Sequence, residues 1–227
     1  MFGIFLPVDT GYFVHFQGLL YSFKELLDID YKIHIIDIGL SDRDLKILNK
    51  NFRFLDFDII KIPYNRDSKI NYKFKIDIIE LMLYSKYDYC MMLDSKNHLK
   101  KKLSCLIPHL DYTPVLIQDI KPYLESEWTH DEALKTMGVY EDDTILLTYQ
   151  YQSNNPIFNM ATARDIMGDI VLYGNMPNAL APPGSKKSFE GDSRHRQDQS
   201  VISVVCKKHG VKPTFYNYST YHNTIHL

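Results

Sequence analysis

Hydrophobic and polar positions form blocks along the first half of the chain, and the period of the pattern changes from block to block. Short apolar runs rich in β-branched residues predict strands, and apolar residues spaced three and four apart predict helices. The predicted strands are 2–8, 32–38, 57–62 and 89–93. The predicted helices between them are 14–27, 41–49 and 72–84. This alternation is typical of a mostly parallel sheet flanked by helices.

The second half of the chain has a less regular pattern. It predicts strands at 115–119, 144–150 and 215–218 and helices at 131–137 and 197–208. Residues 178–196, rich in proline, glycine, serine and charge, predict a long loop, and such loops are often functional. No internal repeat or change of composition divides the sequence. We therefore expect a single α/β domain over residues 1–227.

Composition and charge narrow the possible functions. The 26 lysines and arginines against 28 acidic residues argue against nucleic-acid binding through bulk positive charge. No apolar run approaches the roughly 20 residues of a membrane-spanning helix, and the N-terminus lacks a basic region, so we expect neither an integral membrane segment nor a signal peptide. Three scattered cysteines favour reduced thiols and a cytoplasmic location.

An aspartate follows the last apolar strand of the first half. In the sequence YCMMLDSKN, Asp94 comes directly after the run and Ser95 and Asn97 lie in the polar turn. The carboxyl end of a strand in an open α/β sheet is where ligands bind, and oxygen groups there suit a hard cation. The alternative is that Asp94 only caps the turn.

Two further segments are placed to contact a ligand in the first half. Thr10, Gly11 and Tyr12 follow the first strand, and a glycine there permits close approach of a ligand to the backbone. Lys73 and Lys75 begin a predicted helix, whose free N–H groups favour anions. Both lysines are equally consistent with phosphate binding and with an exposed surface.

A polar turn precedes the last predicted helix. It offers an imidazole, a guanidinium, a carboxylate and an amide from His195, Arg196, Asp198 and Gln199. This set is suitable for sugar binding or acid–base catalysis, although Asp198 is also a favourable residue near a helix N-terminus. The single tryptophan, Trp128, either stacks on a sugar or anchors a loop.

Taken together, these segments resemble the GT-A fold glycosyltransferases, with a likeness to enzymes of large DNA viruses or of bacteria. If the protein is viral, its expected location is the cytoplasm of the host. The resemblance extends over nearly the whole chain. It depends on the segments TGYF (10–13), YKFKIDIIE (72–80), YCMMLDSKN (89–97), WTH (128–130), APPGS (181–185) and HRQDQS (195–200).

The resemblance implies transfer of a sugar from a nucleotide-diphosphate sugar, of which a UDP-sugar is favoured, to a glycan or another hydroxyl acceptor. Residues implied in donor binding are Thr10, Gly11, Tyr12, Lys73, Asp94, Ser95, Asn97 and Arg196. Asp198, Gln199 and His195 are the implied catalytic group. Asp198 would act as the base of an inverting reaction or orient the sugar in a retaining one, and the Asp-Gln pair resembles retaining members.

The family also implies a manganese or magnesium ion held by an Asp-x-Asp motif. Asp94 matches the first aspartate, but the second position is Lys96. Either Asp94 holds the cation with the diphosphate, water and a histidine such as His222, or Lys96 replaces part of its charge. Two other functions stay open. They are a sugar nucleotidyltransferase, disfavoured by the absence of a glycine-rich basic loop after the first strand, and a non-catalytic carbohydrate-binding or scaffold domain.

Overall fold

The structure is a computed structural model of the 227-residue chain. It describes residues 1–62, 72–182, 195–214 and 219–221.

A six-stranded sheet with the strand order β3-β2-β1-β4-β9-β6 forms the centre of the structure. The first four strands of that order run parallel, and β9 runs antiparallel to both of its neighbours. The strands are β1 (Phe2–Val8), β2 (Tyr31–Asp37), β3 (Phe57–Lys61), β4 (Tyr89–Met92), β6 (Val115–Leu116) and β9 (Ile157–Asn159). All seven residues of β1 are buried, because helices cover both faces of a parallel sheet.

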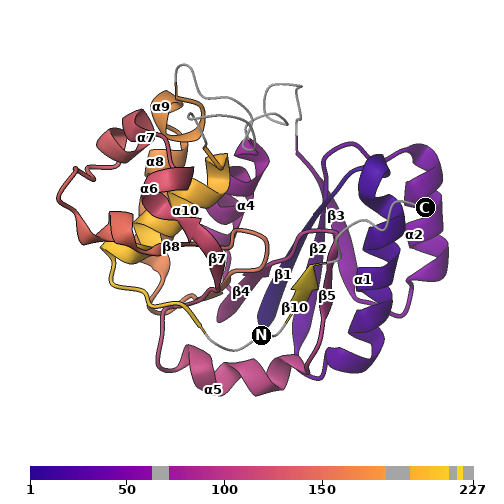
Figure 1. The fold of residues 1–227 in the computed structure, drawn as a ribbon. Helices are drawn as coiled ribbons and strands as arrows, with labels where there is room; N and C mark the ends of the chain where they lie inside the picture. The colour runs from indigo at the N-terminus through magenta and orange to yellow at the C-terminus, as the bar shows by residue number, and fades with distance from the viewer. Residues whose placement is uncertain (63–71, 183–194, 215–218, 222–227) are drawn as a thin grey trace.

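Helices lie on both faces of this sheet (Figure 1). One face packs against α1 (Phe13–Leu26) and α2 (Asp42–Asn51) through apolar side chains such as Phe16 and Leu48. The other face packs against α4 (Lys73–Leu83), α8 (Arg164–Gly174) and α10 (Gln197–Lys208). The helices α4 and α8 approach closely at Gly174, where a Cβ atom would lie 2.7 Å from Ile76. The two hydrophobic layers therefore hold the sheet between them.

Smaller elements complete the described chain. They are η1 (Thr10–Tyr12), β5 (Asn97–Leu99), η2 (Leu103–Leu106), α5 (Ile107–Leu110), β7 (Asp119–Leu124), α6 (Glu125–Trp128), α7 (Asp131–Thr136), η3 (Thr144–Leu147), β8 (Tyr149–Tyr151), α9 (Pro177–Leu180) and β10 (Ser219–Tyr221). Two antiparallel pairs lie outside the central sheet, β10 with β5 and β7 with β8. Within the described residues, no helix has both the length and the apolar character needed to cross a membrane.

The mostly parallel α/β fold predicted from the sequence is confirmed, and the strands and helices of the first half lie within a few residues of their predicted bounds. The second half required corrections. The predicted strand 144–150 is wrong for its first part, because Asp143 accepts a hydrogen bond from the Ile145 amide and begins the short helix η3. Helix α8 was missed, and Gly168 and Gly174 interrupt its sequence pattern.

The predicted strand 115–119 divides between two sheets. The Ile117 amide donates to the Thr214 hydroxyl and the Ile117 carbonyl accepts from the Thr214 amide, so the backbone leaves the central sheet at this residue. The predicted loop 178–196 instead begins within α9. The rest of that loop up to residue 194, apart from Ala181 and Pro182, and the predicted strand 215–218 lie outside the described residues.

The order of the strands determines where a ligand can bind. From β1 the chain proceeds to β2 and β3 on one side and then returns to β4 on the other side. The carboxyl ends of β1 and β4 therefore lie next to each other at a topological switch point. Open α/β sheets bind ligands in the crevice at such a point.

Candidate active site

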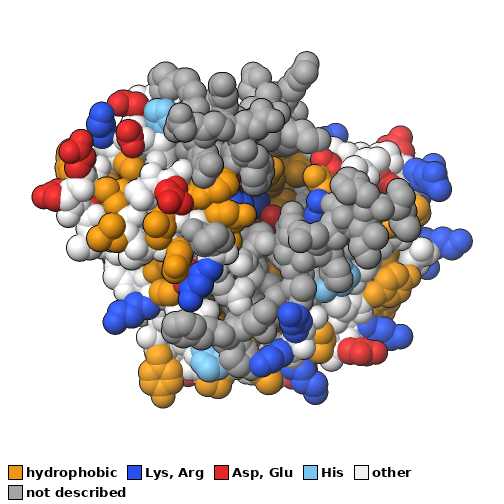
Figure 2. Space-filling model, viewed as in Figure 1, with side chains coloured by type: hydrophobic (Ala, Val, Ile, Leu, Met, Phe, Trp, Pro, Cys, Tyr) orange, Lys and Arg blue, Asp and Glu red, His pale blue; other side chains and the backbone are white. Residues whose placement is uncertain are grey.

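A cavity lies at the carboxyl ends of β1 and β4. Its volume is about 150 Å³, and Figure 2 shows a hollow near the centre of this face with basic and acidic side chains in it. The cavity is lined by Pro7, Val8, Asp9, Tyr12, Ile38, Tyr72, Phe74, Lys75, Asp94, Ser95 and Lys96. Binding pockets for small molecules are usually about 300–1,000 Å³, so a whole nucleotide sugar would extend beyond these residues.

Two carboxylates from distant parts of the chain meet at one lysine in this cavity. The ammonium nitrogen of Lys75 lies 3.0 Å from the carboxylate of Asp94 and 3.4 Å from Oδ2 of Asp198. Lys75 is on α4, Asp94 follows β4, and Asp198 is in the first turn of α10. The convergence of Asp94 and Asp198, which the sequence could only suggest, is therefore a property of the fold.

The charges in this cluster stabilise one another. Burial alone would lower the pKa of Lys75, but the neighbouring charges of Asp198 and Asp94 outweigh it and raise the pKa above its usual value. Burial raises the pKa of Asp94, and Lys75 counteracts this effect. Lys75 is therefore a permanently charged ammonium group at neutral pH.

The two helices that carry Lys75 and Asp198 both begin with an unusual backbone conformation. Tyr72 precedes α4 with φ at 52°, and Gln197 opens α10 with φ at 37°. They are the only non-glycine residues with positive φ in the described part of the chain. Left-handed conformations at such residues cost free energy and often occur at functional sites.

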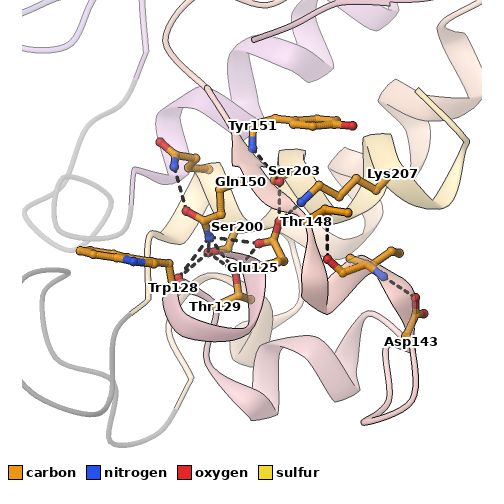
Figure 3. A network of polar contacts seen from close by, with 12 residues as sticks. Glu125, Trp128, Thr129, Asp143, Thr148, Gln150, Tyr151, Ser200, Ser203 and Lys207 are labelled. Atoms are coloured by element: carbon orange, nitrogen blue, oxygen red, sulfur yellow. Dashed lines mark hydrogen bonds and ion pairs between the residues drawn. The ribbon is translucent and has the colours of Figure 1, made fainter. Parts of the chain in front are cut away.

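A buried hydrogen-bond network surrounds Glu125 and Gln150 (Figure 3). It orients Gln199, the residue after Asp198. The side-chain amide nitrogen of Gln150 donates to Glu125, to Thr129 and to the backbone carbonyl of Trp128. A carboxylate and a carbonyl only accept, so the amide of Gln150 can point in only one direction. Its Oε1 therefore accepts from the Nε2 of Gln199 at 2.9 Å. Gln199 therefore joins the network as a donor through its Nε2, and its Oε1 takes no part in these hydrogen bonds.

The centre of this network is the buried ion pair between Glu125 and Lys207. Lys207 Nζ lies 2.5 Å from Glu125 Oε2, and the hydroxyls of Ser203 and Thr129 donate to the same carboxylate. Burial lowers the pKa of Lys207, and the charge of Glu125 only partly compensates. The pair connects α6 to the last turn of α10, and it lies away from the residues that line the cavity. Its role is to fix the position of α10.

The structure places the predicted residues of the HRQDQS turn in different environments. His195 is fully buried, with Nε2 bonded to the Ala179 carbonyl at 2.9 Å and Nδ1 accepting from the His130 amide. Burial lowers its pKa to about 4. His195 is not among the cavity-lining residues, and its two ring nitrogens connect Ala179 of α9 to the backbone of His130. Asp198 is paired with Lys75 in the cluster at the cavity, and Gln199 donates to Gln150 in the buried network.

Arg196 lies over two aromatic rings. Its guanidinium carbon is 5.0 Å from the centre of the Tyr123 ring and 5.7 Å from that of Trp128. These two rings are themselves in contact, with centroids 4.3 Å apart. Trp128 therefore anchors the turn that leads into α10, which was one of the two interpretations of the single tryptophan.

The loop after β1 has a structural and a cavity-facing part. Thr10 donates from its hydroxyl to Asp44 and accepts from the Ser41 amide, so this predicted ligand residue holds the start of α2. Gly11 is exposed, and it is not among the residues that line the cavity. Tyr12 lines the cavity, with its ring centre 4.6 Å from Lys96 Nζ.

The remaining predicted donor residues are distributed over α4 and the turn after β4. Lys73 is paired with Asp77 on its own helix and does not line the cavity. Ser95 lines the cavity. Asn97 is fully buried and donates from Nδ2 to the Asn154 carbonyl, which fixes the turn from behind.

The described residues do not make a divalent-cation site at Asp94. Lys75 is close to both oxygens of this carboxylate, and the second motif position holds another cation, Lys96. No group of three or more histidine, cysteine, aspartate or glutamate side chains with suitable spacing occurs among the residues that the structure describes. The other predicted metal ligand, His222, lies outside them.

Two buried residues of these clusters, Glu125 and Gln150, were not predicted from the sequence, whereas Lys75 was one of two lysines predicted as candidates for phosphate binding. Lys75 has a signal in the sequence, because its position three and four residues before Ile78 and Ile79 puts a charge on the apolar face of its helix. Glu125 and Gln150 have no comparable signal. Their pairing depends on contacts between α6, β8 and α10 that no local pattern predicts.

The fold is similar to those of glycosyltransferases of known structure. The galactosyltransferase LgtC, in complex with donor and acceptor sugar analogues, matches at a TM-score of 0.56 and 16% identity, over 88% of this chain and 69% of LgtC. Mouse xyloside xylosyltransferase 1 matches at 0.58 and 9% identity, over 94% and 84% of the two chains. The bifunctional glycosyltransferase WbbM matches at 0.59 and 13% identity, over 89% of this chain and 37% of WbbM.

No family model and no curated protein matches the sequence. At identities this low, the structural matches show a shared fold and nothing finer. The chain therefore has the α/β fold of these glycosyltransferases, as the sequence resemblance implied.

Proposed function

We propose that the chain is a glycosyltransferase that moves a sugar from a nucleotide-diphosphate sugar to a hydroxyl group of an acceptor such as a glycan. The observation that carries this proposal is the cluster of Asp94, Lys75 and Asp198 beside a cavity at the switch point of the sheet. The shared fold with three glycosyltransferases supports it. A UDP-sugar is the favoured donor, because the sequence resemblance implies it.

In the proposed reaction, the bond between the sugar C1 and the diphosphate oxygen breaks, and the acceptor oxygen bonds to C1. The leaving diphosphate gains negative charge, so positive groups aimed at it lower the barrier. Asp198 and Gln199 are proposed to face the sugar. In an inverting reaction Asp198 takes the acceptor proton, whereas in a retaining reaction the proton goes to the departing diphosphate. The Asp-Gln pair favours the retaining course.

The cavity also supports exclusion of water from the sugar. Water is the acceptor that competes with a hydroxyl group of the glycan, and a closed site protects the activated sugar. Tyr12 and Tyr72 line the cavity and are both more than 40% exposed, so their rings are available to a ligand. They are proposed to contact the donor at the open end of the cavity.

The test is a panel of UDP-glucose, UDP-galactose and UDP-N-acetylglucosamine, with release of UDP and the melting temperature as the two measurements. At least one donor should raise the melting temperature and release UDP. Asp198→Asn should reduce UDP release by about 100-fold or more while the circular dichroism spectrum is retained. Asp165→Asn, at an exposed position in the first turn of α8, is the matched control and should leave the rate unchanged.

The competing proposal is a carbohydrate-binding domain without activity, which the lysine at the second motif position favours. Binding of a glycan with neither UDP release nor a shift with any nucleotide sugar would support that proposal and overturn the transferase. Release of pyrophosphate from a nucleoside triphosphate and a sugar phosphate would instead support a nucleotidyltransferase.

A further inference from the structure

The turn after β4 carries a positive charge where the family resemblance implies a negative one. Lys96 lines the cavity together with Asp94 and Ser95, and its Nζ lies 4.6 Å from the centre of the Tyr12 ring. An aspartate at this position would attract a divalent cation, whereas a lysine repels one. The side chain is therefore placed to act on a ligand in the cavity and not on a metal ion.

A second positive charge already lies between the two acids of the cavity. Lys75 has only 5% of its side chain exposed, and its ammonium group is within 3.4 Å of both Asp94 and Asp198. A divalent cation that bound Asp94 would have to share this carboxylate with the ammonium group. Because like charges this close repel strongly in a buried site, the two modes of binding compete.

The net charge of Asp94 and Lys96 equals the net charge of an Asp-x-Asp motif with its bound divalent cation. Exchange of an aspartate for a lysine changes the local charge by two positive units, which is the charge that one magnesium or manganese ion would bring. The sum of charge that a diphosphate meets at this turn is therefore the same as in an Asp-x-Asp site with its cation. Lysine is also a common ligand of phosphate groups.

We propose that Lys96, with Lys75 held between the two carboxylates, supplies the positive charge for the donor diphosphate, so that the chain binds nucleotide without a divalent cation. This inference rests on the proposed function, because it concerns the same cavity and donor. Lys96 contacts the diphosphate directly. Lys75 is a positioning residue that holds Asp94 and Asp198 together and offsets one of their two negative charges.

The experiment measures UDP binding by isothermal titration calorimetry, in EDTA and in manganese chloride. Wild-type protein should bind UDP in both, with dissociation constants within about threefold of each other. The variant Lys96→Asp restores the second acid of the motif. It should lose UDP affinity by about 100-fold in EDTA and recover most of it in manganese.

Two further variants separate the effect of Lys96 from general electrostatics and from misfolding. Lys100→Asp makes the same change of charge at an exposed position four residues further on, outside the cavity lining, and should bind UDP as the wild type does in both buffers. Lys96→Met only removes the charge and should bind about tenfold more weakly, equally with and without manganese. It keeps the proposal testable if Lys96→Asp does not fold.

Each outcome supports or overturns the inference. If wild-type protein binds UDP in manganese and not in EDTA, the inference is wrong while the proposed function stands, and a cation held by Asp94 and His222 becomes the explanation. Unchanged UDP binding by Lys96→Met also overturns it. If neither UDP nor any nucleotide sugar of the panel binds in either buffer, the proposed function and the inference both fail.

Discussion

Two lysines are buried beside carboxylates in this molecule, and they differ in the number of acids that surround them. Lys75 lies between Asp94 and Asp198 at the cavity, and the two negative charges raise its pKa. Lys207 forms its ion pair with one acid, Glu125, and burial lowers the pKa of Lys207. At Lys207 the hydrogen-bonding groups are provided by the protein itself, whereas the cluster at Lys75 borders a cavity. The arrangement at Lys207 is suited to stability, and the arrangement at Lys75 is suited to ligand binding.

The largest effect on the free energy of unfolding is expected when the ion pair between Glu125 and Lys207 is broken. Glu125→Gln should lower the free energy of unfolding by about 3–5 kcal/mol, because it leaves the ammonium group of Lys207 buried without a counter-charge. Urea denaturation at pH 7 is the measurement. A second substitution, Lys207→Met, should restore part of the loss in the double variant. A loss smaller than about 1 kcal/mol for Glu125→Gln would mean that this pair is no more important than a surface pair.

The next effect concerns His195, which belongs to the interior and not to the cavity. Its folded pKa of about 4 is below the unfolded value of 6.5, so the unfolded chain binds more protons between these pH values. The contribution of His195 to the free energy of unfolding should therefore be fully present above pH 6.5. It should fall by about 3 kcal/mol as the pH drops to 4.

His195→Asn provides the comparison for this pH effect. The variant lacks the titrating group, so the difference in free energy of unfolding between it and the wild type should shrink as the pH falls from 7 to 4. Denaturation curves at several pH values measure it. A difference that does not change with pH would show that His195 is not buried as a neutral ring.

The smallest effect tests the cavity side. In Lys75→Met, the cation that counteracts the raised pKa of Asp94 is removed. When the pKa of a carboxyl group is higher in the folded than in the unfolded chain, its protonated form contributes to the free energy of unfolding at low pH. This contribution is lost as the pH rises through the pKa of the folded state. Relative to wild type, the stability of Lys75→Met should therefore fall by about 1–2 kcal/mol between pH 4 and pH 7.

Lys75→Arg keeps the charge and serves as the control, so its pH dependence should follow that of the wild type. Equal pH dependence of Lys75→Met and wild type would show that Lys75 does not stabilise the charged form of Asp94. In that case the contrast between the two buried lysines would be lost.

The first half of the fold was predictable because amphipathic helices separate its strands and because its central strand β1 is buried on both faces. The run at 2–8 contains no charged residue, the run at 32–38 contains four isoleucines, and Ser41 with Asp44 makes a capping box at the start of α2. The second half was less predictable. Short strands such as β6 and β9 have two or three residues, and pairing with distant strands decides their structure.

The candidate site was predictable in part for the same reason. Asp94 was identifiable because a buried strand ends directly before it, and Asp198 because a polar turn begins an apolar helix. The role of Lys75 and the hydrogen bond from Gln199 to Gln150 depend on the way α4, β8 and α10 pack together. These contacts join residues far apart in sequence, and periodicity carries no information about them.

The bridge made by Lys75 also links ligand binding to the stability of the whole fold. The three residues of the bridge come from α4, from the turn after β4 and from α10, so the cavity exists only when these distant segments are assembled. A nucleotide bound there has no counterpart in the unfolded chain. At concentrations well above its dissociation constant, it will protect the entire protein against heat and proteolysis, including regions that it never contacts.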